Sequence, residues 1–162
     1  MASSALPRQF ALDINQAPKP SLHNFLPNGN EALIDALNQS ITRWNSPAKT
    51  ASHSIEGRWF YWWGSAGAGC SHLLSAIANQ AQTLGMGSIR LLPNDPCTWV
   101  DAEHKLSAAV NPAPIIMTVD DVDQLDTHQQ ASLFRLLNFV HASPHSFVYL
   151  SGHAPPAQLA LR

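Results

Sequence analysis

Residues 59–74 read WFYWWGSAGAGCSHLL, and this stretch decides the fold. Its aromatic run is typical of a β-strand, and the glycines that follow, Gly64, Gly67 and Gly69, indicate a tight loop. The loop leads into a stretch with apolar residues at helical spacing: Leu73, Leu74, Ile77, Ala81 and Leu84. A strand, a glycine-rich loop and a helix in this order predict a phosphate-binding loop, because glycines let backbone N–H groups point inward at the helix N-terminus.

One position departs from the phosphate-loop pattern G-x-x-x-x-G-K-[ST]. Cys70 occupies the lysine position, whereas Ser71 keeps the hydroxyl. Without the lysine, the loop loses a charge-assisted contact worth roughly 1.5–3 kcal/mol, or about 10- to 150-fold in affinity. We therefore expect weak ADP or ATP binding and very poor hydrolysis. The expected nucleotide-binding residues are Gly64, Gly67, Ala68, Gly69, Cys70, Ser71 and His72.

Cys70 itself has two interpretations. At a helix N-terminus, a thiol can have a lowered pKa and react readily. A cysteine packed among apolar side chains is instead inert. The sequence favours the second interpretation.

A second motif lies about 50 residues further along the chain. Residues 114–121 read PIIMTVDD, a hydrophobic strand that ends in the two carboxylates Asp120 and Asp121. This is the form of a Walker B segment, in which the first carboxylate holds Mg²⁺ through water and the second polarises the attacking water. A plain tight turn and a buried strand entering an acidic turn would each be common, but the two motifs in this order favour a P-loop fold. If magnesium nucleotide binds, Ser71 and Asp120 are the expected metal ligands.

The composition is that of one globular domain: 162 residues, 45% hydrophobic and 12% charged. No apolar run approaches the roughly 20 residues that span a bilayer, and the N-terminus does not resemble a signal segment, so we expect no membrane association. Two cysteines form no disulfide framework, and a cytoplasmic location is the default. Nine basic and eleven acidic residues, without a basic cluster, argue against a nucleic-acid-binding face. The eight histidines are scattered, and we interpret them as solvated or locally hydrogen-bonded.

Residues 1–20 are rich in Pro, Ser and Ala and predict a flexible N-terminal arm. The arm contains a glutamine followed by alternating apolar residues: Gln9, Phe10, Leu12 and Ile14. This pattern is consistent with an edge strand or an isolated hydrophobic patch. A short apolar peptide on a flexible arm is also a common docking motif, because it can fold into a partner's groove. The segment resembles the Q-x-x-L-x-L peptide by which proteins bind the bacterial sliding clamp.

Helices and strands alternate through the remainder of the chain. The spacing predicts helices from a cap at Asn28 or Asn30 to Trp44, over 98–110, and from a capping box at Asp126 to His141. Further strands are expected at 88–92, 114–119 and 146–151. Short loops between them predict a parallel sheet with right-handed crossovers, whose chemistry lies at the carboxyl ends of the strands.

Three stretches together resemble the DnaA-like AAA+ family, which includes the bacterial replication initiator DnaA and shorter, Hda-type regulators. They are SLHNF at 21–25 with Asn30, GCSHLL at 69–74, and SGHAPPAQL at 151–159, the sensor 1 position of the family. The resemblance implies an α/β, P-loop NTPase three-layer sandwich over 21–162, with sheet order 5-1-4-3-2. Matching stretches run from Gln9 to Arg162 and stop before the family's arginine-finger segment, so Arg162 is not assigned the finger role. We expect the last strand and the helical lid to be lacking.

The resemblance also implies a function. Hda-type proteins carry a clamp-binding peptide at the N-terminus and have no DNA-binding domain like that of DnaA. They dock on the sliding clamp, the DNA polymerase III β subunit, and promote inactivation of ATP-bound DnaA, so that contact with DNA is indirect and replication initiation is inhibited. Nucleotide would then be structural, favouring the competent conformation. The alternatives are a degenerate or weakly active ATPase or loader and a nucleotide-free scaffold.

The implied sheet order has a physical consequence. Without the fifth strand, the aromatic strand at 59–63 would have an unpaired edge. Such an edge favours aggregation or self-pairing, which would give a homodimer.

Overall fold

The computed structural model describes residues 18–44, 58–107, 114–143 and 145–159. The predicted clamp-binding peptide, Gln9 to Ile14, lies outside these residues. Within them, four parallel strands form one sheet: β1 (Trp59–Trp63), β2 (Gly87–Leu91), β3 (Ile115–Val119) and β4 (Phe147–Gly152). Their order is β1-β4-β3-β2, which confirms the predicted order of these four strands. In the described part of the chain, nothing pairs with the outer edge of β1.

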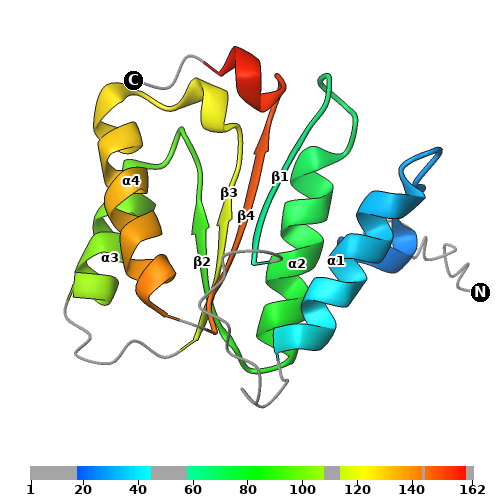
Figure 1. Cartoon of the computed structure of the whole chain (residues 1–162), viewed down its shortest axis with the longest axis horizontal. Coiled ribbons are helices and arrows are strands. Elements are labelled where there is room, and N and C mark those ends of the chain that lie inside the picture. Colours follow the sequence, from blue (N-terminus) through cyan, green and yellow to red (C-terminus); the bar gives the residue numbers. More distant parts are fainter. Residues whose placement is uncertain (1–17, 45–57, 108–113, 144, 160–162) are drawn as a thin grey trace, which may run out of the picture.

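Helices cover both faces of this sheet (Figure 1). The helices α1 (Glu31–Trp44) and α2 (Cys70–Thr83) lie on one face, and α3 (Pro96–Ser107) and α4 (Thr127–Ala142) lie on the other. Three short 3-10 helices complete the described elements: η1 (Leu22–Asn24), η2 (Val122–Gln124) and η3 (Pro156–Gln158). The predicted three-layer α/β sandwich is therefore confirmed. None of the helices seen here combines the length and apolar character that crossing a membrane requires.

Local sequence signals account for where these helices begin and end. The Asp126 carboxylate accepts a hydrogen bond from the Gln129 N–H (2.8 Å), and the Gln129 side chain accepts one from the Asp126 N–H (3.0 Å), so α4 begins with the predicted capping box. Gly85, with a φ of 69°, follows the end of α2 in the left-handed conformation that glycine adopts readily. The third helix begins at Pro96, two residues before the predicted start, because proline is well suited to the first turn.

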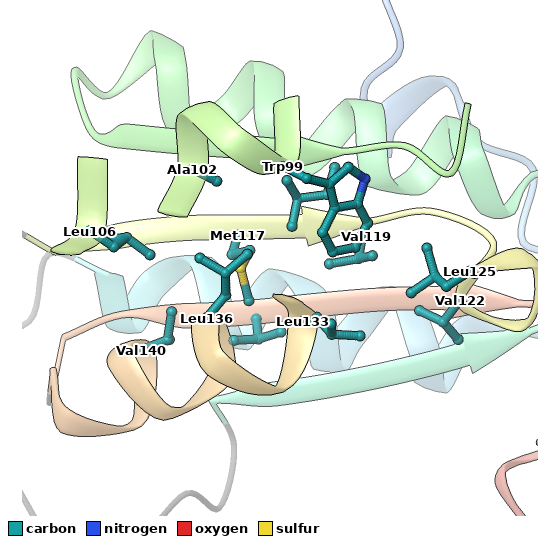
Figure 2. Packing of buried hydrophobic residues seen from close by; sticks show 12 residues of the cluster. Trp99, Ala102, Leu106, Met117, Val119, Val122, Leu125, Leu133, Leu136 and Val140 are labelled. Carbon is teal, nitrogen blue, oxygen red and sulfur yellow. The ribbon is translucent and has the colours of Figure 1, made fainter. Parts of the chain in front are cut away.

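Two hydrophobic cores form, one on each face of the sheet. Side chains alternate along β3, so that Ile116 joins the core under α1 and α2, whereas Met117 and Val119 join the core under α3 and α4. Figure 2 shows that second core, in which Trp99 of α3 and Leu136 of α4 lie close to β3. Strands buried on both faces, as β3 is, are expected for a parallel sheet.

Tyr149 of β4 anchors α1 to the sheet. Its hydroxyl lies 2.8 Å from Ser40 Oγ and accepts a hydrogen bond from Trp44 Nε1 (2.9 Å). Because Ser40 Oγ donates to the Leu37 carbonyl (2.7 Å), the Tyr149 hydroxyl donates to Ser40. Burial raises the pKa of Tyr149 to about 12. This contact fixes α1, and hence the segment preceding it, beside the phosphate loop.

Candidate nucleotide-binding site

Three loops meet at the carboxyl ends of β1, β3 and β4. The strand register places Trp63 opposite Gly152 and Val119 opposite Leu150, and the Gly64 N–H donates to the Gly152 carbonyl (3.1 Å). In Figure 1 the loop after β1 and the segment after β4 lie at the same end of the sheet. Together the loops enclose a cavity of about 350 Å³. It is lined by the whole phosphate loop from Gly64 to His72 and by Asp121, Gly152 and His153.

The backbone of the phosphate loop is shaped to hold an anion. Gly67 and Gly69 have φ values of 85° and 90°, a conformation that glycine adopts without steric cost. The backbone hydrogen bond from the Leu73 N–H to the carbonyl of Gly69, the residue before α2, closes the first turn of this helix (3.0 Å). The N–H groups of Ser71 and His72 therefore lie in the first turn of α2, where no intrahelical acceptor exists. Together with the helix dipole, these donors favour a phosphate group.

The segment before α1 supports this loop from the side. A Cβ atom on Gly69 would lie 2.6 Å from the Phe25 ring, so the ring packs directly on the loop backbone. His72 Nε2 lies 3.1 Å from the Ser21 carbonyl oxygen, and the Asn79 side chain donates to the Pro20 carbonyl (2.9 Å). These three contacts hold the segment from Pro20 to Phe25 against the phosphate loop and α2.

Cys70 is half-buried at the start of α2 and packs against the apolar core under that helix. Burial, and then the negative charges of Asp120 and Asp121, raise the pKa of its thiol. The interpretation of a reactive thiol with a lowered pKa is therefore wrong, and the half-buried, protonated thiol is the better description. No described residue that lines the cavity is lysine or arginine, so the charge lost at position 70 is not replaced by either.

The two Walker B carboxylates lie in different environments. Asp120 is buried, with 6% of its surface exposed, and accepts a hydrogen bond from Ser151 Oγ (2.5 Å). Asp121 lines the cavity in the left-handed conformation, with a φ of 46°. Burial and the adjacent Asp120 raise the pKa of Asp121, and the effect is opposed in part by His153. Asp120 is thus held by β4, while Asp121 faces the space beyond the loop.

Magnesium ligands predicted from the sequence fit the chemistry of that ion only in part. A serine hydroxyl and a carboxylate, from Ser71 and Asp120, are oxygen ligands of the kind that Mg²⁺ prefers. One oxygen of Asp120 is already engaged by Ser151. In the described ranges, this site included, no group of three or more His, Cys, Asp or Glu side chains is arranged to hold a metal ion. A metal here would therefore depend on the phosphate oxygens of a nucleotide.

Two residues that were not among the predicted site residues lie at this end of the sheet: His153 lines the cavity, and Asp123 contacts His153. His153 Nδ1 lies 3.0 Å from Asp123 Oδ2, and the His153 backbone N–H donates to Asp123 Oδ1 (2.9 Å). Burial opposes ionisation of Asp123, but the hydrogen bonds from His153 and Gln124 outweigh it, and the pKa of Asp123 is lowered. The Tyr61 hydroxyl donates to the Ala154 carbonyl (2.5 Å) and fixes the same loop. The sequence feature that could have identified His153 is its position in the 151–159 stretch, which resembles the sensor 1 segment of the family.

Comparison with known proteins gives a consistent result for the fold. No protein-family model matches the sequence. Among solved structures, AMPPCP-bound DnaA from Aquifex aeolicus is 23% identical with a TM-score of 0.63, covering 88% of this chain and 44% of that one. Domain III of the replication initiation protein DnaA from Thermotoga maritima is 19% identical with a TM-score of 0.62, covering 88% and 59%. A replication initiator DnaA bound to AMPPCP and single-stranded DNA is 20% identical with a TM-score of 0.65, covering 89% and 44%.

This chain has the fold of the DnaA AAA+ domain. It spans about half the length of the DnaA chains that it matches. At these identities the similarity establishes the DnaA-like fold alone. The cavity of the present chain occupies the edge of the sheet at which such folds bind their ligands, beyond the carboxyl ends of parallel strands.

Proposed function

We propose that this chain is a DnaA-like AAA+ module that binds nucleotide without rapid hydrolysis and acts as an Hda-type negative regulator of replication initiation. One observation carries the proposal: the cavity keeps the phosphate-loop backbone, but none of the described residues lining it is lysine or arginine. The backbone donors can hold a phosphate group. Phosphoryl transfer also needs positive charge on the transferring group, which this cavity supplies poorly.

Within this proposal, ADP or ATP binds weakly through residues 64–72. The structural neighbours bound to AMPPCP support a nucleotide as the ligand class. Ser71 and Asp120 would hold Mg²⁺ if it entered with the nucleotide, and a bound metal would supply positive charge beside the phosphates. Asp121 faces the cavity and is the candidate for positioning a water molecule.

The regulatory part of the proposal rests on the N-terminal arm. Gln9, Phe10, Leu12 and Ile14 carry the pattern of a clamp-binding peptide, on a segment outside the described residues. A short peptide ahead of a folded domain lets one protein dock on the clamp while the domain contacts a second partner. The second partner proposed here is ATP-bound DnaA.

The test measures hydrolysis of DnaA-bound ATP in the presence of clamp loaded on DNA. The proposal predicts faster hydrolysis when the chain is added, and loss of this effect with the double variant Gln9→Ala, Leu12→Ala. A Gln16→Ala variant alters the same arm outside the motif and should retain the effect. If hydrolysis is unaffected by the wild-type chain, the regulatory proposal is wrong.

A weakly active ATPase is the second candidate, because both Walker B carboxylates are present at the end of β3. It predicts magnesium-dependent turnover by the chain alone. Turnover would be lost in an Asp121→Asn variant, which keeps the size of the side chain but removes its charge. The regulatory proposal predicts no measurable turnover in either protein.

A further inference from the structure

We infer that the outer edge of β1 pairs with the same edge of a second copy of this chain, so that two four-stranded sheets join through an antiparallel β1–β1 contact. The inference goes beyond the proposed function and does not depend on it, because no residue of β1 lines the nucleotide cavity. Among the described strands, β1 is bonded to β4 alone, and Figure 1 shows it at the side of the sheet opposite β2. Its outer edge can therefore accept a further strand.

The hydrogen bonds to β4 show which backbone groups of β1 face outward. The Val148 N–H donates to the Arg58 carbonyl (2.9 Å), and the Gly64 N–H donates to the Gly152 carbonyl (3.1 Å). In a parallel pair, alternate residues of a strand direct both backbone groups to the same neighbour, so the even-numbered residues of β1 bond to β4. The odd-numbered residues, at positions 59, 61 and 63, direct their N–H and C=O groups away from the sheet.

β1 lacks the features by which edge strands usually avoid such pairing. Natural edges are protected by charged side chains, by proline or by bulges that block a further strand. All five residues of β1 are aromatic, and none is charged, proline or glycine. The register with β4 runs from Trp59 to Trp63 without interruption, so the strand has no bulge. An edge that is regular and uncharged along its whole length favours pairing with another strand.

Side chains on one face of β1 would also be covered by a partner strand. Trp59 and Tyr61 pack against the core under α3 and α4, and the alternation of side chains places Trp63 on the same face. Trp63 stacks on Tyr61, with ring centroids 5.8 Å apart, and remains 50% exposed. A strand added beside β1 would bring its own side chains against the exposed Trp63 ring. Aromatic pairs across neighbouring strands stabilise a sheet.

The sequence of β1 favours a second copy as the partner. With two strands antiparallel about a two-fold axis at Tyr61, Trp59 of each copy lies opposite Trp63 of the other. Phe60 then lies opposite Trp62, so every cross-strand pair is aromatic, and all outward-facing backbone groups of the strand find partners. No like charges meet, and the formal net charge of the chain is only −2, so electrostatic repulsion between the copies is weak. This arrangement assigns an interface to the homodimer expected from the sequence.

The experiment measures the mass of the full chain by sedimentation equilibrium between about 1 and about 100 μM, where we expect dimers to predominate at the highest concentration. Trp63→Pro removes an outward N–H and no bond to β4, so it should weaken dimerisation at least about tenfold. Trp63→Lys keeps the N–H but places a charge at the edge, and should also weaken dimerisation. Phe134→Lys makes the same kind of change at a 68% exposed residue of α4 and should match the wild type.

Hydrogen exchange followed by NMR distinguishes this interface from coverage of the edge by another segment of the same chain. In the wild type, the N–H groups of Trp59, Tyr61 and Trp63 should exchange more slowly as the protein concentration rises. The N–H groups of Phe60 and Trp62, which bond to β4, should be protected at every concentration.

Each outcome supports the inference or overturns it. A wild type that stays monomeric up to about 100 μM contradicts it, as do assemblies larger than a dimer, because the two-fold contact is closed. Slow exchange at positions 59, 61 and 63 that is independent of concentration would show that the chain covers its own edge. A dimer that is unaffected by the Trp63 variants, or lost in Phe134→Lys, would place the interface elsewhere. Circular dichroism verifies the fold of each variant, and the lysine variant decides if the proline variant is unfolded.

Discussion

The Ser151 hydroxyl donates a hydrogen bond of 2.5 Å to Asp120, and its oxygen lies 3.4 Å from the Asp121 N–H. Ser151 is fully buried near the end of β4, and Asp120 is 6% exposed at the end of β3. One side chain of the inner strand β4 thus contacts both Walker B residues. These two contacts fix the position of Asp120 and Asp121 relative to β4, and therefore relative to the phosphate loop that lies beside it.

Replacing Ser151 with alanine should destabilise the fold. The Ser151→Ala variant removes a donor to a buried carboxylate, which costs roughly 1.5–3 kcal/mol of unfolding free energy. Urea unfolding measures this cost. Ser88→Ala is the matched control, because Ser88 is exposed on β2, and it should change stability by less than about 0.5 kcal/mol. Equal midpoints for the two variants would show that the Ser151–Asp120 contact contributes nothing.

Restoring the missing lysine should strengthen nucleotide binding. A Cys70→Lys variant returns the charge-assisted contact and should raise ADP affinity by about 10- to 150-fold. Cys70→Met, which has a long but uncharged side chain, controls for the change in packing. The comparison needs only ADP titration of the three proteins. A gain with methionine as large as that with lysine would contradict the electrostatic explanation.

The raised pKa of Cys70 predicts slow alkylation. A thiol whose pKa lies above its ordinary value has a smaller thiolate fraction at neutral pH, and the thiolate is the reactive form. A Cys97→Ser chain, which retains only Cys70, should therefore react more slowly at about pH 7 than a Cys70→Ser chain, which retains the exposed Cys97. The rate for Cys70 should still be rising at about pH 9. A rate that has already reached its plateau at neutral pH would rule out the raised pKa.

Gly152 has no room for a side chain. A Cβ atom there would lie 2.6 Å from the Tyr61 hydroxyl and 2.8 Å from Asp123 Oδ1. Gly152→Ala should therefore cost about 1–3 kcal/mol and separate Asp123 from His153. Gly87→Ala is the control on another strand, because the nearest atom to its Cβ would be an ordinary contact at 3.5 Å. Unfolding curves for the two variants test the prediction, and no difference between them would contradict it.

Much of this fold could be predicted from local patterns. The aromatic strand, the glycine loop and the apolar spacing of α2 are encoded within residues 59–84, and the Asp126 capping box marks the start of α4. Parallel pairing followed from the alternation of strands and helices. Boundaries shifted by one or two residues where competing signals overlap, as at Pro96.

The site was harder to predict because its contacts join residues far apart in the sequence. The phosphate loop and Asp121 follow from motifs, and the cavity brings them together. In contrast, the contact between Asp123 and His153 depends on the register of β3 and β4, across a separation of 30 residues. No periodicity encodes such a pair. Its importance emerges only once the sheet places the ends of these strands side by side.

The most direct test of the proposed function is calorimetry of the full chain with the purified sliding clamp. The wild type is measured beside the Gln9→Ala, Leu12→Ala double variant and the Gln16→Ala control. The proposed clamp-dependent role predicts micromolar binding by the wild type and by the control, and no binding by the double variant. Absence of binding in the wild type, or equal binding by the double variant, would contradict the clamp-dependent regulatory role.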